Sequence, residues 1–239
     1  MKTILKISTL ILLIITTSSC MFEFFGIQGN RNVITEHRKI SSDFEGITVS
    51  QGITVYLSQG KKMALTVEAD ENIIDLLMTE IEGDELKIYF KKNVNRAKAR
   101  NVYVTVDRIN SIKTSSGSHV KTEHLLRTKS IRLESTSGSG IKVDLDAQKV
   151  TCSTTSGANI HISGNTDYFK GNATSGSHIN AKELKSNISD VDVSSGAGIK
   201  IYVKDEVTAR ASSGGNISYY GNPELVNKSK SSGGRISKR

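Results

Sequence analysis

The chain has 239 residues, of which 36% are hydrophobic and 5% aromatic, and its 32 Lys and Arg outweigh 24 Asp and Glu to give a formal charge of +8. This composition excludes a disordered chain, a collagen-like chain and a membrane protein with several spans, and the length is sufficient for one or two domains with a hydrophobic core. Because Trp is absent and other aromatics are scarce, that core must consist mainly of Val, Ile, Leu and Ala with small polar residues.

The start of the chain has the pattern of an export signal. Lys2 and Lys6 are basic, residues 7–15 are almost wholly apolar, and small residues lead up to Cys20. The apolar run is about half as long as a membrane-spanning helix requires. A Cys directly after small residues resembles a bacterial lipoprotein signal. We therefore predict a signal peptide over residues 1–19 and lipidation of Cys20, and the alternative is an ordinary cleaved signal.

Residues 20–40 are predicted to be a lipidated tether. Acyl chains on Cys20 would anchor the protein to membrane lipid. The expected location is therefore the cell envelope, as an exported outer-membrane lipoprotein that faces either the cell surface or the periplasm. The sequence has two Cys, so lipidation of Cys20 leaves Cys152 as the other thiol, and no intramolecular disulfide is expected.

Residues 41–110 are predicted to form a less regular β region with one short helix. Apolar residues alternate with polar ones in several segments, as is typical of strands: 44–57, 63–67, 86–90 and 102–106. Asp70 is the predicted N-cap of a short helix that contains Ile73, Ile74 and Leu77. Two arrangements stay open for this region, namely wider coils of the stack that follows or a small β domain that caps it.

A repeat of about 19 residues occupies residues 111–239. A Ser-Gly pair recurs seven times, with steps of 21, 19, 19, 20, 18 and 19 between successive Gly residues, and a branched aliphatic residue stands three positions after each Gly. The pairs are Ser116-Gly117, Ser137-Gly138, Ser156-Gly157, Ser175-Gly176, Ser195-Gly196, Ser213-Gly214 and Ser232-Gly233. Because the spacing within a unit is two, each unit is predicted to be one coil of a β-helix.

Each Ser-Gly pair is predicted to mark a corner of its coil. The Ser is expected to point inward and fill the corner. The residue two positions after the Gly is usually Gly, Asn or His, which tolerate a left-handed backbone, so this column is predicted to turn the chain: His119, Gly140, Asn159, His178, Gly198, Asn216 and Arg235. Lys228 and Lys230 fall at inward positions of the last unit, which predicts an irregular final coil that acts as a polar cap.

The predicted fold class is all-β, a right-handed β-helix-like solenoid with coils of about 19 residues. Several segments resemble the "head GIN" domain family (DUF2807) of putative auto-transporter adhesins from Bacteroidetes: Phe44-Glu45-Gly46-Ile47, Gly52-Ile53-Thr54-Val55, residues 65–72, residues 83–88 and the Ser-Gly repeats. The resemblance covers residues 40–239, with Thr54 where the family's name suggests Asn. It implies a β-helix-like fold in a cell-envelope lipoprotein and raises the expectation of a binding role.

Candidate catalytic acids are sparse. Asp144 with Asp146, and Asp190 with Asp192, have the spacing of outward carboxylates that a glycosidase needs. The coil between the two pairs has no acid at the matching place. None of the Ser-Gly serines stands in a nucleophile motif with a partner His. We therefore predict no catalytic residues and no enzyme activity.

Metal and thiol chemistry are not expected either. His119 and His178 share a column but lie roughly 14 Å apart at the sheet spacing, so they cannot bind one metal ion. Cys152 aligns with apolar core positions and is predicted to be buried. No metal site and no cofactor are predicted.

Basic residues cluster between Leu86 and Lys113, where eight Lys and Arg face Asp107 alone. A solvated basic loop is one interpretation, and contact with anionic envelope polymers is the other. No nucleic-acid-binding motif accompanies the cluster, so no nucleic acid partner is predicted.

The sequence favours a non-enzymatic, membrane-anchored module that binds a glycan or a protein through polar side chains on the coil faces. Lys142, His161, Asn180 and Lys200 each follow the repeated aliphatic residue and are expected to point outward. Two alternatives stay open. One is a polysaccharide-active β-helix enzyme, and the other is a periplasmic structural or sensing protein in which the rod is a spacer.

Overall fold

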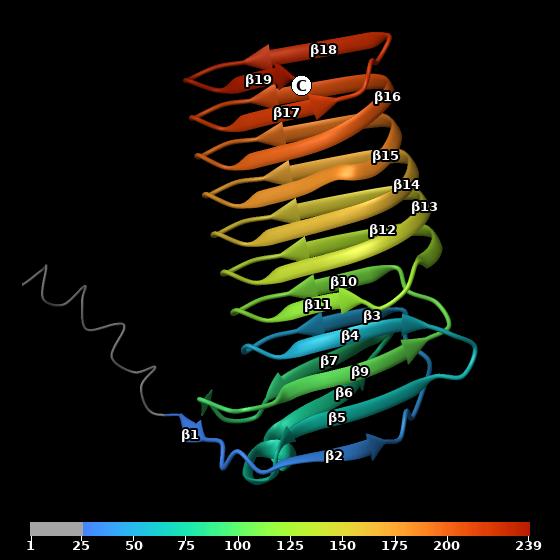
Figure 1. The fold of residues 1–239 in the computed structure, drawn as a ribbon, viewed down its shortest axis with the longest axis vertical. Helices are drawn as coiled ribbons and strands as arrows, with labels where there is room; N and C mark the ends of the chain where they lie inside the picture. Colours follow the sequence, from blue (N-terminus) through green and yellow to red (C-terminus); the bar gives the residue numbers. More distant parts are fainter. Residues whose placement is uncertain (1–25) are drawn as a thin grey trace, which may run out of the picture.

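The computed structural model describes residues 26–239. The predicted signal peptide and Cys20 lie outside the described residues, so lipidation stays a prediction. Within residues 26–239 no helix has the length and apolarity to cross a bilayer. The chain forms a column of stacked β coils, with β2 (Val33–Arg38) near one end and β18 (Leu225–Lys230) and β19 (Arg235–Lys238) at the other (Figure 1).

The repeat region forms these stacked coils. Each of four long strands makes most of a coil: β13 (Gly140–Thr154), β14 (Asn159–Ala173), β15 (His178–Val193) and β16 (Gly198–Ala211). Shorter strands complete the stack on either side: β10 (Ser111–Thr114), β11 (His119–Thr122), β12 (Leu126–Ser135), β17 (Asn216–Tyr220), β18 (Leu225–Lys230) and β19 (Arg235–Lys238). Neighbouring coils pair in parallel, with Ile160 between Ile141 and Ile179. The predicted all-β solenoid with coils about 19 residues apart is confirmed.

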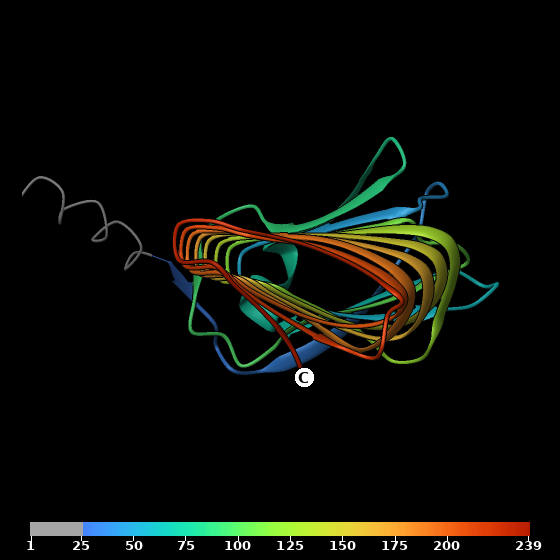
Figure 2. The ribbon, with the colours of Figure 1, turned by 90° about the horizontal axis from the view of Figure 1, so that it is seen from above.

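Each coil is flattened, with two faces that meet at a narrow end and at a rounded end (Figure 2). The tight Ser-Gly turns form the narrow end, and the long strands curve around the other. Side chains alternate in and out along both faces, so each coil adds inward aliphatic residues to one continuous core. Phe169 is the largest fully buried side chain. Cys152 is buried between Leu133 and Gly171 of the neighbouring coils.

The tight turns do not have the predicted geometry. The Ser and the Gly of each pair are both left-handed, for example with φ of 53° at Ser156 and 71° at Gly157. Two successive positive φ values define the type I′ turn, which joins strands without splaying them. Ser156 is exposed, and Asn159 is an extended strand residue. The predictions of an inward Ser and of a left-handed residue two positions after the Gly were therefore wrong.

The residue directly after each Gly is the one that points inward, because the two left-handed residues interrupt the alternation of the strand. Where this residue is Ser, its buried hydroxyl closes the turn by donating to a backbone oxygen. Ser118 Oγ donates to the carbonyl of Ser115 at 2.8 Å, and Ser177 Oγ donates to the carbonyl of Thr174 at 2.7 Å. Within residues 26–239 every buried side-chain nitrogen and oxygen has a partner, as close packing around such turns requires.

The region before the repeat continues the stack. Strands β3 (Gly46–Val49) and β4 (Thr54–Gln59) pair in parallel with β10 and β11. The turn between them, Gln51-Gly52, has φ of 61° and 70° like the Ser-Gly turns. Strands β7 (Glu85–Phe90) and β9 (Arg100–Val106) pair in parallel with β3 and β4. These four strands therefore form two further coils of the same solenoid.

Antiparallel strands close the N-terminal end. β2 (Val33–Arg38) pairs with β5 (Ala64–Asp70), which pairs with β9, and β6 (Leu77–Glu82) pairs with β7. A short pair, β1 (Ile27–Gln28) and β8 (Val94–Asn95), lies beside them. The structure thus combines both arrangements that the sequence left open for residues 41–110. It also incorporates residues 33–38, which the sequence assigned to the tether, into the sheet.

A 3₁₀ helix, η2 (Glu71–Leu76), stands where a short helix was predicted. Asp70 occupies its N-cap position, but the carboxylate does not cap the helix. It accepts hydrogen bonds from the backbone N–H groups of Arg31 at 2.9 Å, Lys98 at 3.0 Å and Ala99 at 2.9 Å. The predicted capping role of Asp70 was therefore wrong, and its actual role is to join three segments of the chain.

The last coil keeps the register of the stack. Lys228 lies beside Ala209, Lys230 lies beside Ala211, and Ser232 and Gly233 form the same left-handed turn with φ of 45° and 78°. The predicted irregularity of this coil was wrong. The Lys228 ammonium lies 4.7 Å from the centroid of the Tyr219 ring, so a cation covers the end of the core at an inward position.

Candidate ligand-binding groove

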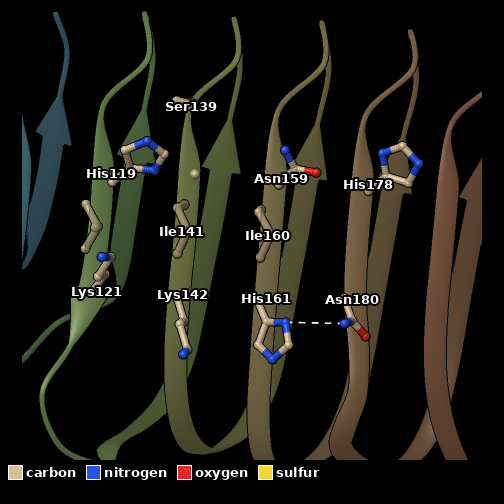
Figure 3. Close-up of a pocket in the computed structure, with 12 residues that line it drawn as sticks. His119, Lys121, Ser139, Ile141, Lys142, Asn159, Ile160, His161, His178 and Asn180 are labelled. Atoms are coloured by element: carbon tan, nitrogen blue, oxygen red, sulfur yellow. Dashed lines mark hydrogen bonds between the residues drawn. The ribbon is translucent and has the colours of Figure 1, made fainter. Parts of the chain in front are cut away.

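A shallow groove crosses the coils on the face that follows each Ser-Gly turn. Two depressions of about 350 and 430 Å³ adjoin each other at His178 and Asn180, so they form one continuous feature. The groove runs from β11 to β17, along the direction in which the coils stack. Figure 3 shows the side chains of successive coils that line its first part.

Two columns of outward residues line this groove, because every second residue of a strand lies on the same face. The first column lies nearer the turn and comprises His119, Gly140, Asn159, His178, Gly198 and Asn216. The second column lies two positions further along each strand and comprises Lys121, Lys142, His161, Asn180 and Lys200. Successive members of a column are about 4.8 Å apart, the spacing of paired strands. The groove therefore offers polar groups at a regular interval.

In the first column, each His lies over the Gly of the next coil. A Cβ at Gly140 would lie 2.7 Å from Nδ1 of His119, and a Cβ at Gly198 would lie 3.0 Å from Cδ2 of His178. Neither Gly has a positive φ. These glycines are therefore required for space and not for backbone freedom. The order His-Gly-Asn occurs twice along the groove, so the pattern of imidazole and amide groups repeats.

The lining of the groove is basic. Lys121, Lys142 and Lys200 are exposed, and neither depression is lined by Asp or Glu. Partial burial lowers the pKa of His119, and the nearby charge of Lys121 lowers it further. His161 is the one groove imidazole near an acid, since its Nε2 lies 3.8 Å from Glu183.

The structure places all four predicted outward residues in the second column. Lys142, His161 and Asn180 line one depression, and Asn180 and Lys200 line the other. The Asn180 amide and Nδ1 of His161 are 3.3 Å apart, within hydrogen-bond distance (Figure 3). The sequence interpretation missed the whole first column, which it assigned to corners. The recurrence of His-Gly-Asn every third coil was the signal that pointed to a surface role.

The structure places the candidate acid pairs in polar contacts with neighbouring side chains. Arg210 bridges one pair, with Nη2 at 2.5 Å from Asp190 and Nε at 2.6 Å from Asp192. Asp144 accepts a hydrogen bond from Ser163 at 3.1 Å. Within residues 26–239 no group of three His, Cys, Asp or Glu residues could hold a metal ion.

The basic stretch between Leu86 and Lys113 lies outside the groove and is partly neutralised. Lys113 lies 3.1 Å from Glu85, Arg108 lies 3.1 Å from Glu45, and Lys87 pairs with Glu82. Three further lysines, Lys91, Lys92 and Lys98, are exposed in the connection between β7 and β9. This surface and the groove are thus separate basic regions, and substitutions of their lysines can test each region independently.

Comparison with known proteins places these features in context. The profile of the family described as "Putative auto-transporter adhesin, head GIN domain" matches residues 43–223. A putative adhesin from Bacteroides fragilis is 21% identical, with a TM-score of 0.83 over 90% of this chain and 100% of that chain. No curated protein matches the chain.

Two further solved structures have the same fold. A putative lipid binding protein from Parabacteroides distasonis is 23% identical, with a TM-score of 0.70 over 90% of this chain and 100% of that chain. A putative adhesin from Parabacteroides merdae is 16% identical, with a TM-score of 0.74 over 90% of this chain and 99% of that chain. At identities this low, the structural similarity shows a shared fold only. The ligand therefore has to be inferred from the groove.

Proposed function

Because the chain belongs to the head GIN family of putative auto-transporter adhesins, we propose that it is a non-enzymatic cell-envelope protein that binds an extended glycan or protein segment along the groove. The observation that carries this proposal is the alignment of two polar columns over successive coils. Related structures named as adhesins support a role of this type.

The shape of the groove favours an extended ligand. Binding sites for small molecules are usually concave pockets that enclose most of the ligand. The depressions on this face are shallow and adjoin each other across the coils, so a compact ligand would contact a fraction of the available groups. A chain that lies along the stack would contact every coil. Affinity would then come from many modest polar contacts.

A binding array tests this function. The full chain, purified in detergent, would be applied to immobilised polysaccharides and envelope proteins. We expect at least one extended polymer to bind, and the double variant Asn159→Ala/Asn216→Ala to reduce its binding about 30-fold, since each of the two lost hydrogen bonds contributes roughly 1 kcal/mol. Both residues are exposed in the first column.

The matched control changes exposed residues on the other face of the stack. Ser153 and Asn172 are exposed neighbours on β13 and β14, and Ser153→Ala/Asn172→Ala should leave binding unchanged. Equal losses in the two double variants, or no bound polymer at all, would contradict the proposed function.

The location of the protein is part of the same proposal. The pattern before Cys20 supports export and lipidation, and the names of the relatives support an envelope location. Protease shaving of intact host cells tests it. Degradation while periplasmic markers survive would place the groove outside the cell. Survival until the outer membrane is opened would exclude external adhesion and favour a periplasmic spacer or sensor.

A further inference from the structure

We propose that the groove binds a linear anionic polysaccharide, and that it does so more tightly as the pH falls through the range in which histidine gains a proton. This inference rests on the proposed function and specifies its ligand. It is carried by six side chains of the groove: Lys121, Lys142, Lys200, His119, His161 and His178.

These six side chains are distributed evenly along the groove. Strands β11, β13, β14, β15 and β16 each contribute at least one of them, so five successive coils each carry a cationic or protonatable group. Adjacent coils are about 4.8 Å apart, so the row extends over roughly 20 Å. A polymer with an anionic group on most of its units matches such a row, whereas a single compact anion would contact one or two members.

The lysines of the groove are available to a ligand. None of the ion pairs within residues 26–239 involves Lys121, Lys142 or Lys200. Three acids lie just beyond the second column. Glu123 accepts a hydrogen bond from Ser58 at 2.6 Å, Asp144 accepts one from Ser163 at 3.1 Å, and Glu183 lies 3.8 Å from both His161 and Lys182. The three ammonium groups therefore have no ion-pair partner among the described residues and can contact an anionic ligand.

The rest of the lining favours a saccharide over a protein or a membrane. Side-chain amides stand among the cations, and amides both donate to and accept from hydroxyl groups. Within the described residues, none of the exposed large hydrophobic side chains lies in the groove. A protein interface usually has apolar or aromatic anchors, and a bilayer surface would contact a protruding basic face better than a concave one.

Three of the five histidines of the sequence lie in this groove. Lys121 faces His119 on its own strand, while the paired residues on either side are uncharged, Thr54 and Gly140. His178 is flanked by Asn159 and Gly198. An anionic ligand would therefore supply the negative charge that stabilises both imidazolium forms.

His161 has one cationic and one anionic neighbour. Lys142 is its paired residue on β13, and the carboxylate of Glu183 on β15 lies 3.8 Å from its Nε2. Glu183 would satisfy part of its charge without a ligand, so His161 is expected to contribute least to the pH dependence. By linkage, a ligand that favours protonation binds more tightly at low pH.

The experiment compares dextran sulfate with uncharged dextran, by titration calorimetry with the full chain in detergent at pH 7.5 and pH 5.5. Sulfate esters stay ionised at both values, so any change in affinity comes from the protein. We expect dextran sulfate to bind about tenfold more tightly at pH 5.5, which corresponds to one unit of total pKa shift on binding. Dextran should bind at least about tenfold more weakly than dextran sulfate at either pH, since it offers no charge to the lysines.

Matched variants assign the effect to the groove. Lys121→Gln/Lys142→Gln/Lys200→Gln should lower the affinity for dextran sulfate about 100-fold, with each lost charge contact counting for a factor of about five. The control Lys91→Gln/Lys92→Gln/Lys98→Gln removes the same net charge from exposed residues outside the groove and should lower it less than about threefold. His119→Gln/His161→Gln/His178→Gln should bind dextran sulfate with the same affinity at pH 5.5 as at pH 7.5, because the variant has no imidazole to protonate.

Three results would overturn this inference. They are equal binding of the two dextrans, equal loss in the two lysine variants, or a wild-type affinity that does not change with pH. If dextran sulfate fails to bind but an array polymer binds in a manner sensitive to Asn159 and Asn216, the anionic ligand is wrong and the proposed function stands. If no polymer binds through the groove, both are wrong.

Discussion

At the scale of single residues, Asp70 is the most constrained group of the N-terminal end. It is fully buried and accepts hydrogen bonds from the N–H groups of Arg31, Lys98 and Ala99. Burial by itself would raise the pKa of Asp70, but the three backbone donors and the charge of Arg31 outweigh it and hold the pKa below its usual value. The ionised carboxylate is therefore part of the fold.

Replacement of Asp70 should weaken this end of the solenoid. We expect Asp70→Asn to lower the free energy of unfolding by about 3 kcal/mol at pH 7, because the amide replaces a charged acceptor and turns N–H groups towards the donors. Because the folded-state pKa is depressed, the contribution of Asp70 is complete above its unfolded pKa of about 3.9 and is lost as the pH falls through the folded value. Urea denaturation at pH 7 and at pH 3 measures the difference.

Asp75→Asn provides the control for this comparison. Asp75 is exposed on η2, so its replacement should change the urea midpoint little at either pH. A variant of Asp70 as stable as wild type at pH 7 would show that the backbone donors find other acceptors.

At the scale of elements, the repeated type I′ turn forms the narrow end of the coils from the β3–β4 coil onward. Gly157 has φ of 71°, and a Cβ at this position would have no heavy atom within 4 Å. The turn therefore requires glycine for its backbone conformation and leaves the space around it open. Gly171 is the opposite case, because a Cβ there would lie 2.9 Å from the Phe169 ring. Gly157 is required for the backbone conformation of the turn, and Gly171 is required for the packing of the core.

The turn makes a clear prediction for substitution. Gly157→Ala should cost about 1 kcal/mol through the left-handed backbone alone. Ser156→Ala in the same turn should be nearly neutral, because the Ser side chain is exposed and an L-residue already occupies that left-handed position. Thermal denaturation of the two variants checks this. A neutral Gly157→Ala would mean that the turn relaxes to another type.

The element scale also shows what the sequence predicts and what it does not. The spacing from each Gly to the aliphatic residue predicts strands, coil length and register, because a buried column such as Ile141, Ile160 and Ile179 has to stay aligned. The prediction for the turn was wrong because side chains alternate between inward and outward only along a strand. The two left-handed residues of the turn interrupt that alternation. Strand β2 was missed because most of its side chains are exposed, and its partner β5 is distant in sequence.

The groove illustrates the same limit. The outward positions of Lys142 and Lys200 follow from parity within a strand, so the sequence places them correctly. That His119 lies over Gly140 is a contact between coils, and it depends on the parallel register and not on neighbours in the chain. The role of Asp70 likewise depends on three segments that meet only in the folded protein.

At the scale of the whole molecule, the solenoid is a stack of nearly equivalent layers. β13 pairs with β14 and β14 with β15 through the same columns, so β13 and β15 present compatible edges. In such a stack each layer contacts mainly its neighbours, and stability is approximately a sum over layers and interfaces. Length is therefore a property that the molecule can change without a change of fold.

Removal of one complete layer tests this view. Deletion of residues 158–176 joins Gly157 to Ser177 and brings β13 next to β15 with every column preserved. We expect a folded monomer with an unchanged β-sheet circular dichroism spectrum. Deletion of residues 158–167, which removes part of a layer, should instead give aggregated protein, because it misaligns the inward columns. Size-exclusion chromatography separates the outcomes, and aggregation of both variants would show that the layers are not equivalent.

The parallel pairing of the coils has a mechanical consequence. Hydrogen bonds between coils run along the stacking axis, so a pull between the two ends of the column loads one interface at a time. Each coil of about 19 residues would release roughly 60 Å of chain when it peels away, at about 3.3 Å per residue. Force spectroscopy should therefore show a regular sawtooth. A protein fixed at one end and attached to a partner at the other would lengthen under flow in steps before the attachment failed.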